Sequence, residues 1–215
     1  MDARELIAMR VGQEFHNGDY VNLGIGIPTL VANYLPRGVT VTLQSENGFL
    51  GLGPSPAPGK ADMDLVNAGG QPVTILPGGA TFDSATSFAI IRGGHIAATV
   101  LGALEADEEG NLANWIIPGI MAPGMGGAMD LVVGARRVIL AMKHTSKGRP
   151  KILKRCTLPL TAVKEVDMIV TELAVFKYLP RLTLVELAPG VNKEQVREAT
   201  PADYDIAPDL KPMPV

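Results

Sequence analysis

The sequence predicts an α/β protein built on one open, mostly parallel β-sheet. Strand-like segments alternate with turns and with segments of helical pattern, which is the order of elements in such folds. The strand-like segments are apolar, as expected of strands that are covered on both faces. Because no repeat and no linker interrupts this pattern, we expect residues 1–215 to form a single domain.

The first half of the chain is expected to open with a helix. Asp2 and Glu5 have the spacing of a capping box, and Asn17-Gly18 would end the helix. After a glycine-rich turn, Pro28 suits the first turn of a second helix over 29–34. Apolar and β-branched residues predict strands over 20–23, 39–43 and 73–76.

The second half continues the alternation of strands and helices. Helices are expected over 83–92 and 193–199. Strands are expected over 96–101, 112–117, 138–142, 168–170 and 182–187. Gly124 to Ala128 predicts a second glycine-rich turn, and the Pro-rich end from Pro208 to Val215 is expected to lie on the surface as a tail.

Charge and cysteine content exclude several classes of protein. With 22 acidic and 19 basic side chains, the chain has a net charge of −3 and no field that would attract nucleic acid. The single cysteine, Cys156, excludes an internal disulfide framework and is typical of a reducing compartment. The chain opens with polar residues, and its apolar runs are shorter than the ~20 residues that span a bilayer. We therefore expect a cytoplasmic protein with no nucleic-acid or membrane partner.

Hydropathy points to a protein partner. The mean hydropathy is +0.20, with 47% hydrophobic and 19% charged residues. A lone domain of this length needs less apolar surface than this to form its core. We therefore expect part of the surface to be buried in a large protein–protein interface.

Familiar cofactor motifs are absent from the sequence. Gly24-x-Gly26 resembles the start of a dinucleotide-binding loop, but Thr29 replaces the third glycine and Pro28 interrupts the loop. A tight turn and a backbone loop that lines a site both remain open for this segment. The three histidines and the cysteine lack the spacing of zinc ligands, so no metal site is expected.

Two charged clusters each admit two interpretations. Asp62 and Asp64 have the spacing of one strand face, where they would bind a hard cation or form a solvated edge. The run from Lys143 to Arg155 contains six basic residues and no acidic one. Such a run is typical of a solvated loop, and it also suits a phosphate-bearing ligand.

Glu46 is the strongest candidate for chemistry. It directly follows an apolar strand, and ligands of open α/β sheets bind beyond the carboxyl ends of strands. A carboxylate there can act as a base, a metal ligand or a nucleophile toward an activated acyl group. No second metal ligand and no histidine partner stands nearby, which favours the nucleophile over the other two roles. A solvated surface glutamate is the alternative.

A carboxylate nucleophile places two demands on its surroundings. It needs hydrogen-bond donors for the oxyanion that forms, and water must be excluded because water would hydrolyse the acyl intermediate. The glycine-rich turn from Gly124 to Ala128 can present backbone N–H groups for this purpose. Its glycines allow a reacting group to approach the main chain closely.

Five segments spread over nearly the whole chain carry a specific family resemblance. They are Asn22–Pro28, Gln44–Gly48, Leu112–Trp115, Gly124–Asp130 and Cys156–Thr161. With these segments the sequence resembles the B (beta) subunit of the family I coenzyme A transferases, which is also the C-terminal half of the fused members. The resemblance implies an open α/β sheet of the NagB/RpiA-like type, in agreement with the pattern of elements.

The resemblance also implies a mechanism and a set of site residues. Glu46 would attack an acyl-CoA thioester and carry CoA to a second acid through a glutamyl-CoA thioester, in a ping-pong reaction. CoA would be a substrate, with no tightly bound cofactor and no metal. By position in the motifs, the oxyanion and CoA contacts fall on Gly126, Gly127 and Ala128, and the substrate cleft on Gly24 and Gly26.

The family offers several substrate pairs, of which succinyl-CoA and a 3-oxoacid such as acetoacetate, the pair of ketone body metabolism, is expected. A 3-oxoadipate or a butyrate–acetoacetate transferase, an acyl-CoA hydrolase and a non-catalytic ligand-sensing module of the same fold are the alternatives. Glu105 stands where many relatives are expected to have glutamine. A carboxylate there would alter the binding of the acid substrate, unless it is a solvated rim residue.

The resemblance finally implies a second chain. Family members are built from two homologous halves with the active site between them, and this chain corresponds to one half. We therefore expect a separate A (alpha) subunit of the CoA-transferase as its partner, in a heterotetramer.

Overall fold

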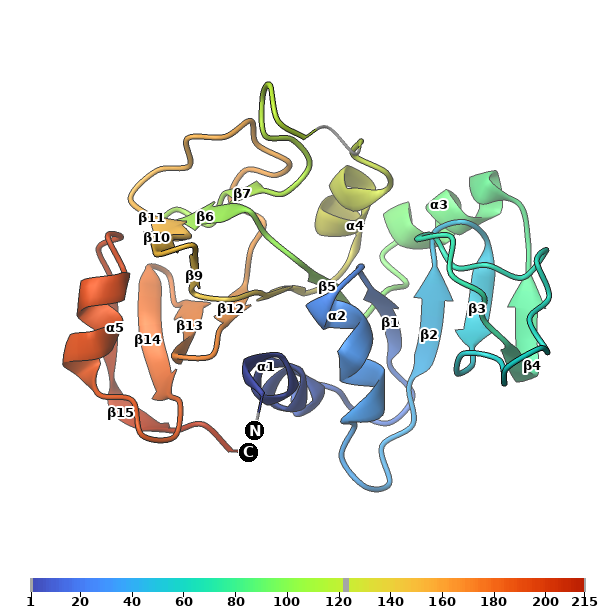
Figure 1. Cartoon of the computed structure of the whole chain (residues 1–215), viewed down its shortest axis with the longest axis horizontal. Coiled ribbons are helices and arrows are strands. Elements are labelled where there is room, and N and C mark those ends of the chain that lie inside the picture. The colour runs from blue at the N-terminus through green and yellow to red at the C-terminus, as the bar shows by residue number, and fades with distance from the viewer. Residues whose placement is uncertain (1, 122–123, 215) are drawn as a thin grey trace.

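The computed structural model describes residues 2–121 and 124–214 and is built around a ten-stranded sheet (Figure 1). The strand order is β15-β14-β13-β12-β8-β5-β1-β2-β3-β4. The strands are β1 (Tyr20–Leu23), β2 (Thr42–Ser45), β3 (Phe49–Leu52), β4 (Ile75–Thr81), β5 (Ala98–Leu101), β8 (Val138–Ala141), β12 (Met168–Val170), β13 (Ala174–Tyr178), β14 (Leu182–Leu187) and β15 (Asp205–Pro212).

Helices and two small sheets cover this large sheet. The helices are α1 (Ala3–Gly12), α2 (Ile27–Leu30), the 3-10 helix η1 (Val31–Asn33), α3 (Ser84–Arg92), α4 (Ala128–Gly134) and α5 (Lys193–Ala199). The small sheets contain β6 (Glu105–Asp107), β7 (Leu112–Ala113) and β11 (Ile152–Leu153), and β9 (Thr145–Ser146) with β10 (Arg149–Pro150). Among the described residues, no helix is long and apolar enough to cross a membrane.

The centre of the large sheet is parallel, which confirms the predicted fold class. β12, β8, β5, β1 and β2 are neighbours, and each adjacent pair among them runs parallel. The antiparallel pairs lie toward the margins, where β3 and β4 follow β2 and where β13 lies between β12 and β14. The carboxyl ends of the five central strands therefore meet along one edge of the sheet.

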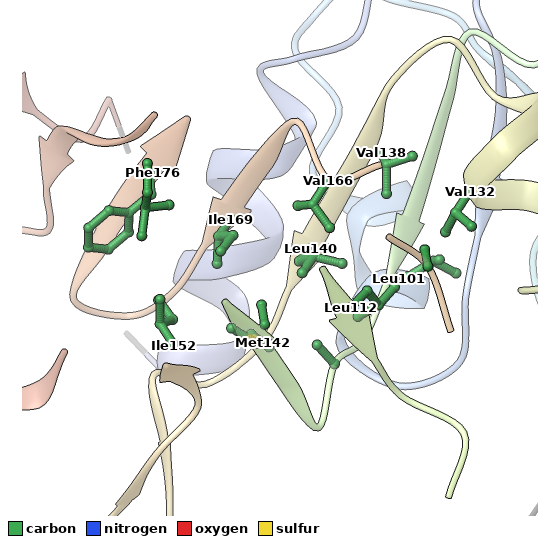
Figure 2. Close-up of a cluster of buried hydrophobic side chains, with 14 of the residues drawn as sticks. Leu101, Leu112, Val132, Val138, Leu140, Met142, Ile152, Val166, Ile169 and Phe176 are labelled. Carbon is green, nitrogen blue, oxygen red and sulfur yellow. The ribbon is translucent and has the colours of Figure 1, made fainter. Parts of the chain in front are cut away.

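Apolar side chains fill both faces of the sheet. Alternate residues of one strand point to opposite faces, so that Ile139 and Val170 belong to one core cluster and Leu140 and Ile169 to the other. The first cluster includes side chains of α1, and the second includes side chains of α3, α4 and α5. Figure 2 shows the second cluster, in which Phe176 extends the row of Leu140 and Ile169. Burial on both faces explains why the strands read as apolar runs.

Several predicted elements have the expected bounds. The strands over 20–23, 168–170 and 182–187 and the helix over 193–199 coincide with β1, β12, β14 and α5. Asp2 and Glu5 form the predicted capping box, but α1 ends at Gly12, earlier than expected. A Cβ at Gly12 would overlap the carbonyl oxygen of Tyr34, so the chain passes very closely at this point.

Other predictions about elements are wrong. The strand expected over 39–43 spans Thr42–Ser45. The polar residues at its end, Gln44 and Ser45, are buried and accept hydrogen bonds from Asn22 and Ala68. The strand expected over 112–117 is only Leu112–Ala113, and helix α4 after the second glycine-rich turn was not expected. The expected surface tail is largely strand β15, which pairs with β14 at the sheet margin, where proline is tolerated. Val215 lies outside the described residues.

The imidazole of His144 connects the end of β8 with two other segments. Its Nδ1 lies 2.9 Å from Thr171 Oγ1 and its Nε2 lies 2.9 Å from Thr200 Oγ1. The residue is fully buried, and burial lowers its pKa to about 4. Two hydroxyl partners and a low pKa indicate a neutral imidazole that serves the fold.

This imidazole predicts a pH dependence of stability. In the unfolded chain His144 binds a proton below about pH 6.5, whereas in the folded chain it remains neutral down to about pH 4. The free energy of unfolding should therefore fall as the pH drops through this window, by at most about 1.4 kcal/mol per pH unit. Urea unfolding between pH 7 and 4.5 measures the slope, and His144→Gln should lack this part of it. Equal slopes in the two proteins would contradict the assignment.

Candidate active site

Glu46 lies in the three-residue turn between β2 and β3, at the carboxyl end of a parallel strand. Ser45 and Phe49 pair across the base of this turn. Gly48 has a φ of 120°, and a Cβ there would overlap the carbonyl oxygen of Phe82. Only glycine fits this position, and the turn leaves the Glu46 side chain half-buried.

The second glycine-rich segment reaches this carboxylate from 81 residues away along the chain. The backbone N–H of Gly127 donates a hydrogen bond to Glu46 Oε1 at 3.0 Å. A Cβ at Gly127 would lie 2.9 Å from Glu46 Oε2, and a Cβ at Gly126 would lie 3.1 Å from Oε1. The carboxylate therefore rests directly on main chain that carries no side chains.

The other candidate glycines and Ala128 differ in their surroundings. The N–H of Ala128 donates to the carbonyl oxygen of Met125 at 3.2 Å, within the same turn. Gly26, with a φ of 93°, lines an open cleft beside the site. Gly24 is not among the residues that line this cleft: its N–H donates to Val100 at 2.8 Å and ties the end of β1 to β5.

A chain of buried polar side chains lies beneath the Glu46 turn. Asn22 Nδ2 donates to Gln44 Oε1 at 2.7 Å, and Gln44 Nε2 donates to Ser87 Oγ at 2.9 Å. Ser87 Oγ in turn donates to the carbonyl oxygen of Ser45 at 3.4 Å. The chain connects β1, β2 and α3 and ends on the residue before Glu46. Sequence reasoning missed it, although polar residues inside an apolar strand were the available signal.

The loop between β3 and β4 also forms hydrogen bonds with this turn. Asn47 Nδ2 donates to the carbonyl oxygen of Val66 at 2.7 Å, and the N–H of Ala68 donates to Ser45 Oγ at 3.1 Å. The turn that carries Glu46 is thus hydrogen-bonded, through Ser45 and Asn47, both to α3 and to the loop between β3 and β4. Such contacts restrict the directions in which its carboxylate can point.

Helix α3 supports both partners of the contact between Glu46 and Gly127. It carries Ser87 beneath the turn, and its last turn packs so closely on α4 that a Cβ at Gly134 would overlap the Ile91 carbonyl oxygen. Arg92 Nε also donates to Asp130 Oδ1 at 2.6 Å. Since α4 begins directly after Gly127, this packing fixes the position of the Gly127 N–H.

An open cleft of about 690 Å³ lies along the same edge of the sheet. Its lining includes Gly26 after β1, Gly102 after β5, Lys143 after β8 and Glu172 after β12. Lys151 also lines it, and burial lowers the pKa of this lysine to about 8, although the negative charge of Glu172 opposes the shift. The cleft therefore extends over the ends of β1, β5, β8 and β12, and β1 is the neighbour of β2, the strand that Glu46 follows.

The remaining charged candidates from the sequence are Glu105 and the pair Asp62 and Asp64. The Glu105 carboxylate accepts hydrogen bonds from the N–H and hydroxyl of Thr157 and from the N–H of Leu158, at 2.7–3.0 Å. Asp62 and Asp64 are exposed and lie in a loop, which agrees with the solvated alternative and not with a cation site on one strand face. Within residues 2–121 and 124–214, no three His, Cys, Asp or Glu side chains gather as metal ligands would.

The sequence relatives of the chain include coenzyme A transferase subunits. A family model described as Coenzyme A transferase matches residues 4–199. The beta subunit of the acetate CoA-transferase of Escherichia coli (strain K12) is 62% identical over 212 residues, which cover 98% of this chain and 97% of that protein. The B subunit of a probable succinyl-CoA:3-ketoacid coenzyme A transferase of Bacillus subtilis (strain 168) is 53% identical over 208 residues, which cover 96% of each.

A solved structure shares the fold. An acyl-CoA transferase from Escherichia coli O157:H7 superposes with a TM-score of 0.76 at 22% sequence identity. The match covers 99% of this chain and 43% of the other, so the present chain spans less than half of that longer protein. At this identity, the similarity shows the architecture alone.

The contact between Glu46 and Gly127 predicts the effect of one added methyl group. In Gly127→Ala the Cβ displaces the Glu46 carboxylate, while the backbone angles at this position, φ −86° and ψ 9°, remain open to alanine. The variant should fold normally and lose at least about a hundredfold in the rate of CoA transfer. Thermal unfolding and the rate of CoA exchange test the two parts. Retained exchange would show that the contact is dispensable.

The buried polar chain predicts a coupled loss of stability. Ser87→Ala leaves the Gln44 amide without its acceptor and should cost about 1–3 kcal/mol of unfolding free energy. Ser84→Ala, at an exposed position of the same helix, is the matched control. Gln44→Met combined with Ser87→Ala should cost less than the sum of the two single changes. Additive costs would mean that the two side chains act independently.

Proposed function

The chain belongs to the coenzyme A transferase family, and we propose that it supplies Glu46 as the nucleophile that carries CoA between two carboxylic acids. One observation carries the proposal: the Gly127 N–H donates to Glu46 Oε1 at 3.0 Å at the carboxyl edge of the sheet. A carboxylate is itself a nucleophile and needs no base to activate it.

The first half-reaction begins at the acyl-CoA thioester. A Glu46 carboxylate oxygen attacks the thioester carbonyl carbon, and the C–S bond breaks with its electron pair on the CoA thiolate. The product is a mixed anhydride between the acyl group and Glu46. The thiolate then attacks Cδ of Glu46 and releases the first acid as a carboxylate. CoA now forms a thioester with Glu46, and no proton has been transferred.

The Gly127 N–H suits the second of these steps. Attack on Cδ develops negative charge on the carbonyl oxygen of Glu46 itself, and this N–H already donates to a Glu46 oxygen. A donor that is in place before the charge forms requires no reorganisation in the transition state. The second carboxylic acid attacks the glutamyl-CoA thioester and reverses the sequence, which regenerates the Glu46 carboxylate.

The exchange of CoA needs no further reactant to drive it. One thioester is consumed and one is formed, so the exchange requires no nucleoside triphosphate. Its rate depends on holding the reacting groups in line and on excluding water from the anhydride and the thioester. An acyl-CoA hydrolase differs in admitting water at this stage, whereas a ligand-sensing module would not need a nucleophile at Glu46.

A second polypeptide is part of the proposal. The relatives named above are beta and B subunits by name, which supports an A (alpha) subunit of the CoA-transferase as the partner and a heterotetramer as the assembly. Apolar side chains beside the site also support a covering partner: Ile25 is 72% exposed, and Met129 and Val133 are 39% and 71% exposed on α4. We further propose the cytoplasm as the location of the enzyme, as expected from the single cysteine.

For the acids, we propose succinyl-CoA and a 3-oxoacid such as acetoacetate. The name of the Bacillus subtilis relative, at 53% identity, supports this pair. The name of the Escherichia coli relative, at 62% identity, favours acetate as a second candidate acid. Acetate was not among the acids expected from the motifs.

The glutamyl-CoA thioester can be detected directly. The chain and its alpha subunit, incubated with acetoacetyl-CoA and no acceptor acid, should yield a CoA adduct on the peptide that contains Glu46. Glu46→Gln and Glu46→Ala should abolish both the adduct and the exchange, whereas Glu198→Gln, at an exposed position of α5, should keep both. An adduct on another residue, or normal turnover by Glu46→Ala, would falsify the mechanism.

An acceptor panel decides between the acids. Exchange rates with succinate, acetoacetate, acetate, butyrate and 3-oxoadipate are compared at equal concentrations on the same preparation. The proposed pair predicts the highest kcat/KM for succinate and acetoacetate, because the substrate is selected by differences in transition-state binding. A higher value for acetate than for succinate would contradict the proposed pair and leave the role of Glu46 intact.

A further inference from the structure

Two of the segments that carry the family resemblance, Leu112–Trp115 and Cys156–Thr161, have no part in the site described so far. Among the described residues, neither segment touches Glu46 through a hydrogen bond or lines the cleft. The two segments instead pair with each other, since the N–H of Thr161 donates to the carbonyl oxygen of Leu112 at 2.7 Å. They form one hydrogen-bonded unit, and its link to the cleft indicates what the unit does.

The side chain of Asn114 provides this link. Its Nδ2 donates to the carbonyl oxygen of Gly102 at 3.2 Å, and its Oδ1 accepts a hydrogen bond from Thr161 Oγ1 at 2.7 Å. The hydroxyl oxygen of Thr161 also accepts from the N–H of Asn114 at 3.1 Å. Because the hydroxyl donates to Oδ1, the amide must present its NH2 group to Gly102. Thr161 is 6% exposed, so water has little access to this lock.

Gly102 is the residue of the cleft that Asn114 holds. It directly follows β5 and lines the cleft together with Ala103, and a Cβ on it would meet no atom within 4 Å. In a trans peptide the C=O and the N–H point in opposite directions, so the N–H of Ala103 points away from Asn114. In the part of the chain that the structure describes, this N–H has no hydrogen-bond acceptor. The main chain at this point is therefore open to a ligand.

Strand order sets the distance from this peptide to the reacting carboxylate. Gly102 follows β5 and Glu46 follows β2, with β1 between them. Two strand spacings of ~4.8 Å place the two strand ends roughly 10 Å apart. When the carbonyl carbon of a bound thioester lies at Glu46, only a part of the substrate beyond that carbon can touch Gly102. The peptide can therefore act on the placement of the substrate and takes no part in bond making.

From these contacts we infer that Asn114 and Thr161 are positioning residues for CoA transfer. Thr161 orients the Asn114 amide, Asn114 holds the Gly102–Ala103 peptide, and this peptide aligns the bound thioester with Glu46. The inference rests on the proposed function. Alignment is worth this support because a displacement of ~1 Å from the reactive geometry can cost about a hundredfold in rate. A contact surface aligns its ligand only when the residues behind it are themselves held.

Variants of Thr161 separate alignment from packing. Thr161→Val keeps the shape and removes the hydroxyl, and it should lower kcat by about tenfold or more. The KM for acetoacetyl-CoA should change by less than about threefold, because a misaligned substrate still binds. Thr161→Ser keeps the hydroxyl and should retain most of the wild-type kcat, although it loses a buried methyl group. Asn114→Asp, which replaces the NH2 donor by an oxygen, should lower kcat as Thr161→Val does.

Gly102→Ala tests whether a substrate lies on this peptide. The added methyl group meets no protein atom, and the φ of Gly102 lies outside the left-handed region, so the variant should unfold at the wild-type temperature. Because the methyl group occupies space that the substrate needs, the KM for acetoacetyl-CoA should rise by about fivefold or more. Thr40→Val makes the Thr161 change at an exposed position before β2 and should alter neither kcat nor KM. All variants are assayed together with the alpha subunit, and thermal unfolding shows the folded fraction of each.

The outcomes distinguish this inference from the proposed function. Wild-type kcat in folded Thr161→Val, an equal loss of kcat in Thr161→Ser, or a rise in KM alone in Thr161→Val would overturn the positioning role. Unchanged kinetics in Gly102→Ala would overturn it as well, because no substrate would then touch the peptide. In each of these cases a CoA adduct on Glu46 of the wild-type enzyme still supports the nucleophile. Loss of that adduct from the wild-type enzyme would instead overturn the proposed function.

Discussion

The contact between the Glu46 carboxylate and the Gly127 backbone N–H is the constraint on which the site depends. It joins two turns that are 81 residues apart, and it allows no side chain at the point of contact. A side-chain donor would add rotamer freedom, whereas a backbone N–H at the start of a packed helix has a fixed direction. The accuracy of the site therefore depends on how well the two turns are held.

Both turns are held by α3 and by the order of the strands. The parallel strands place Glu46 at the same edge as the ends of β1, β5 and β8, and the buried chain from Asn22 through Gln44 to Ser87 joins this edge to α3. The same helix packs against α4, which begins after Gly127. One helix thus sets the distance between the carboxylate and its donor, and the core on that face keeps the helix in place.

The strand edge also separates two kinds of chemistry. The Glu46 end offers one carboxylate and a backbone donor, whereas the cleft beyond β5 and β8 carries the cations. Separation by three strands also weakens the interaction between the lysines and the Glu46 carboxylate, because opposite charges that far apart interact weakly in a solvated cleft.

The amino-acid sequence was enough to predict the α/β class, the bounds of β1, β12, β14 and α5, and Glu46 with the glycine-rich turn as candidates. These features depend on local patterns: apolar runs, capping residues and glycines. The packing of the folded chain was needed to show that Gly127 rather than Ala128 donates to Glu46, and that Glu105 holds the 157–158 loop. It also shows that three lysines of the basic run line the cleft. Such contacts join residues distant in sequence, and local patterns carry no information about which distant segments pack together.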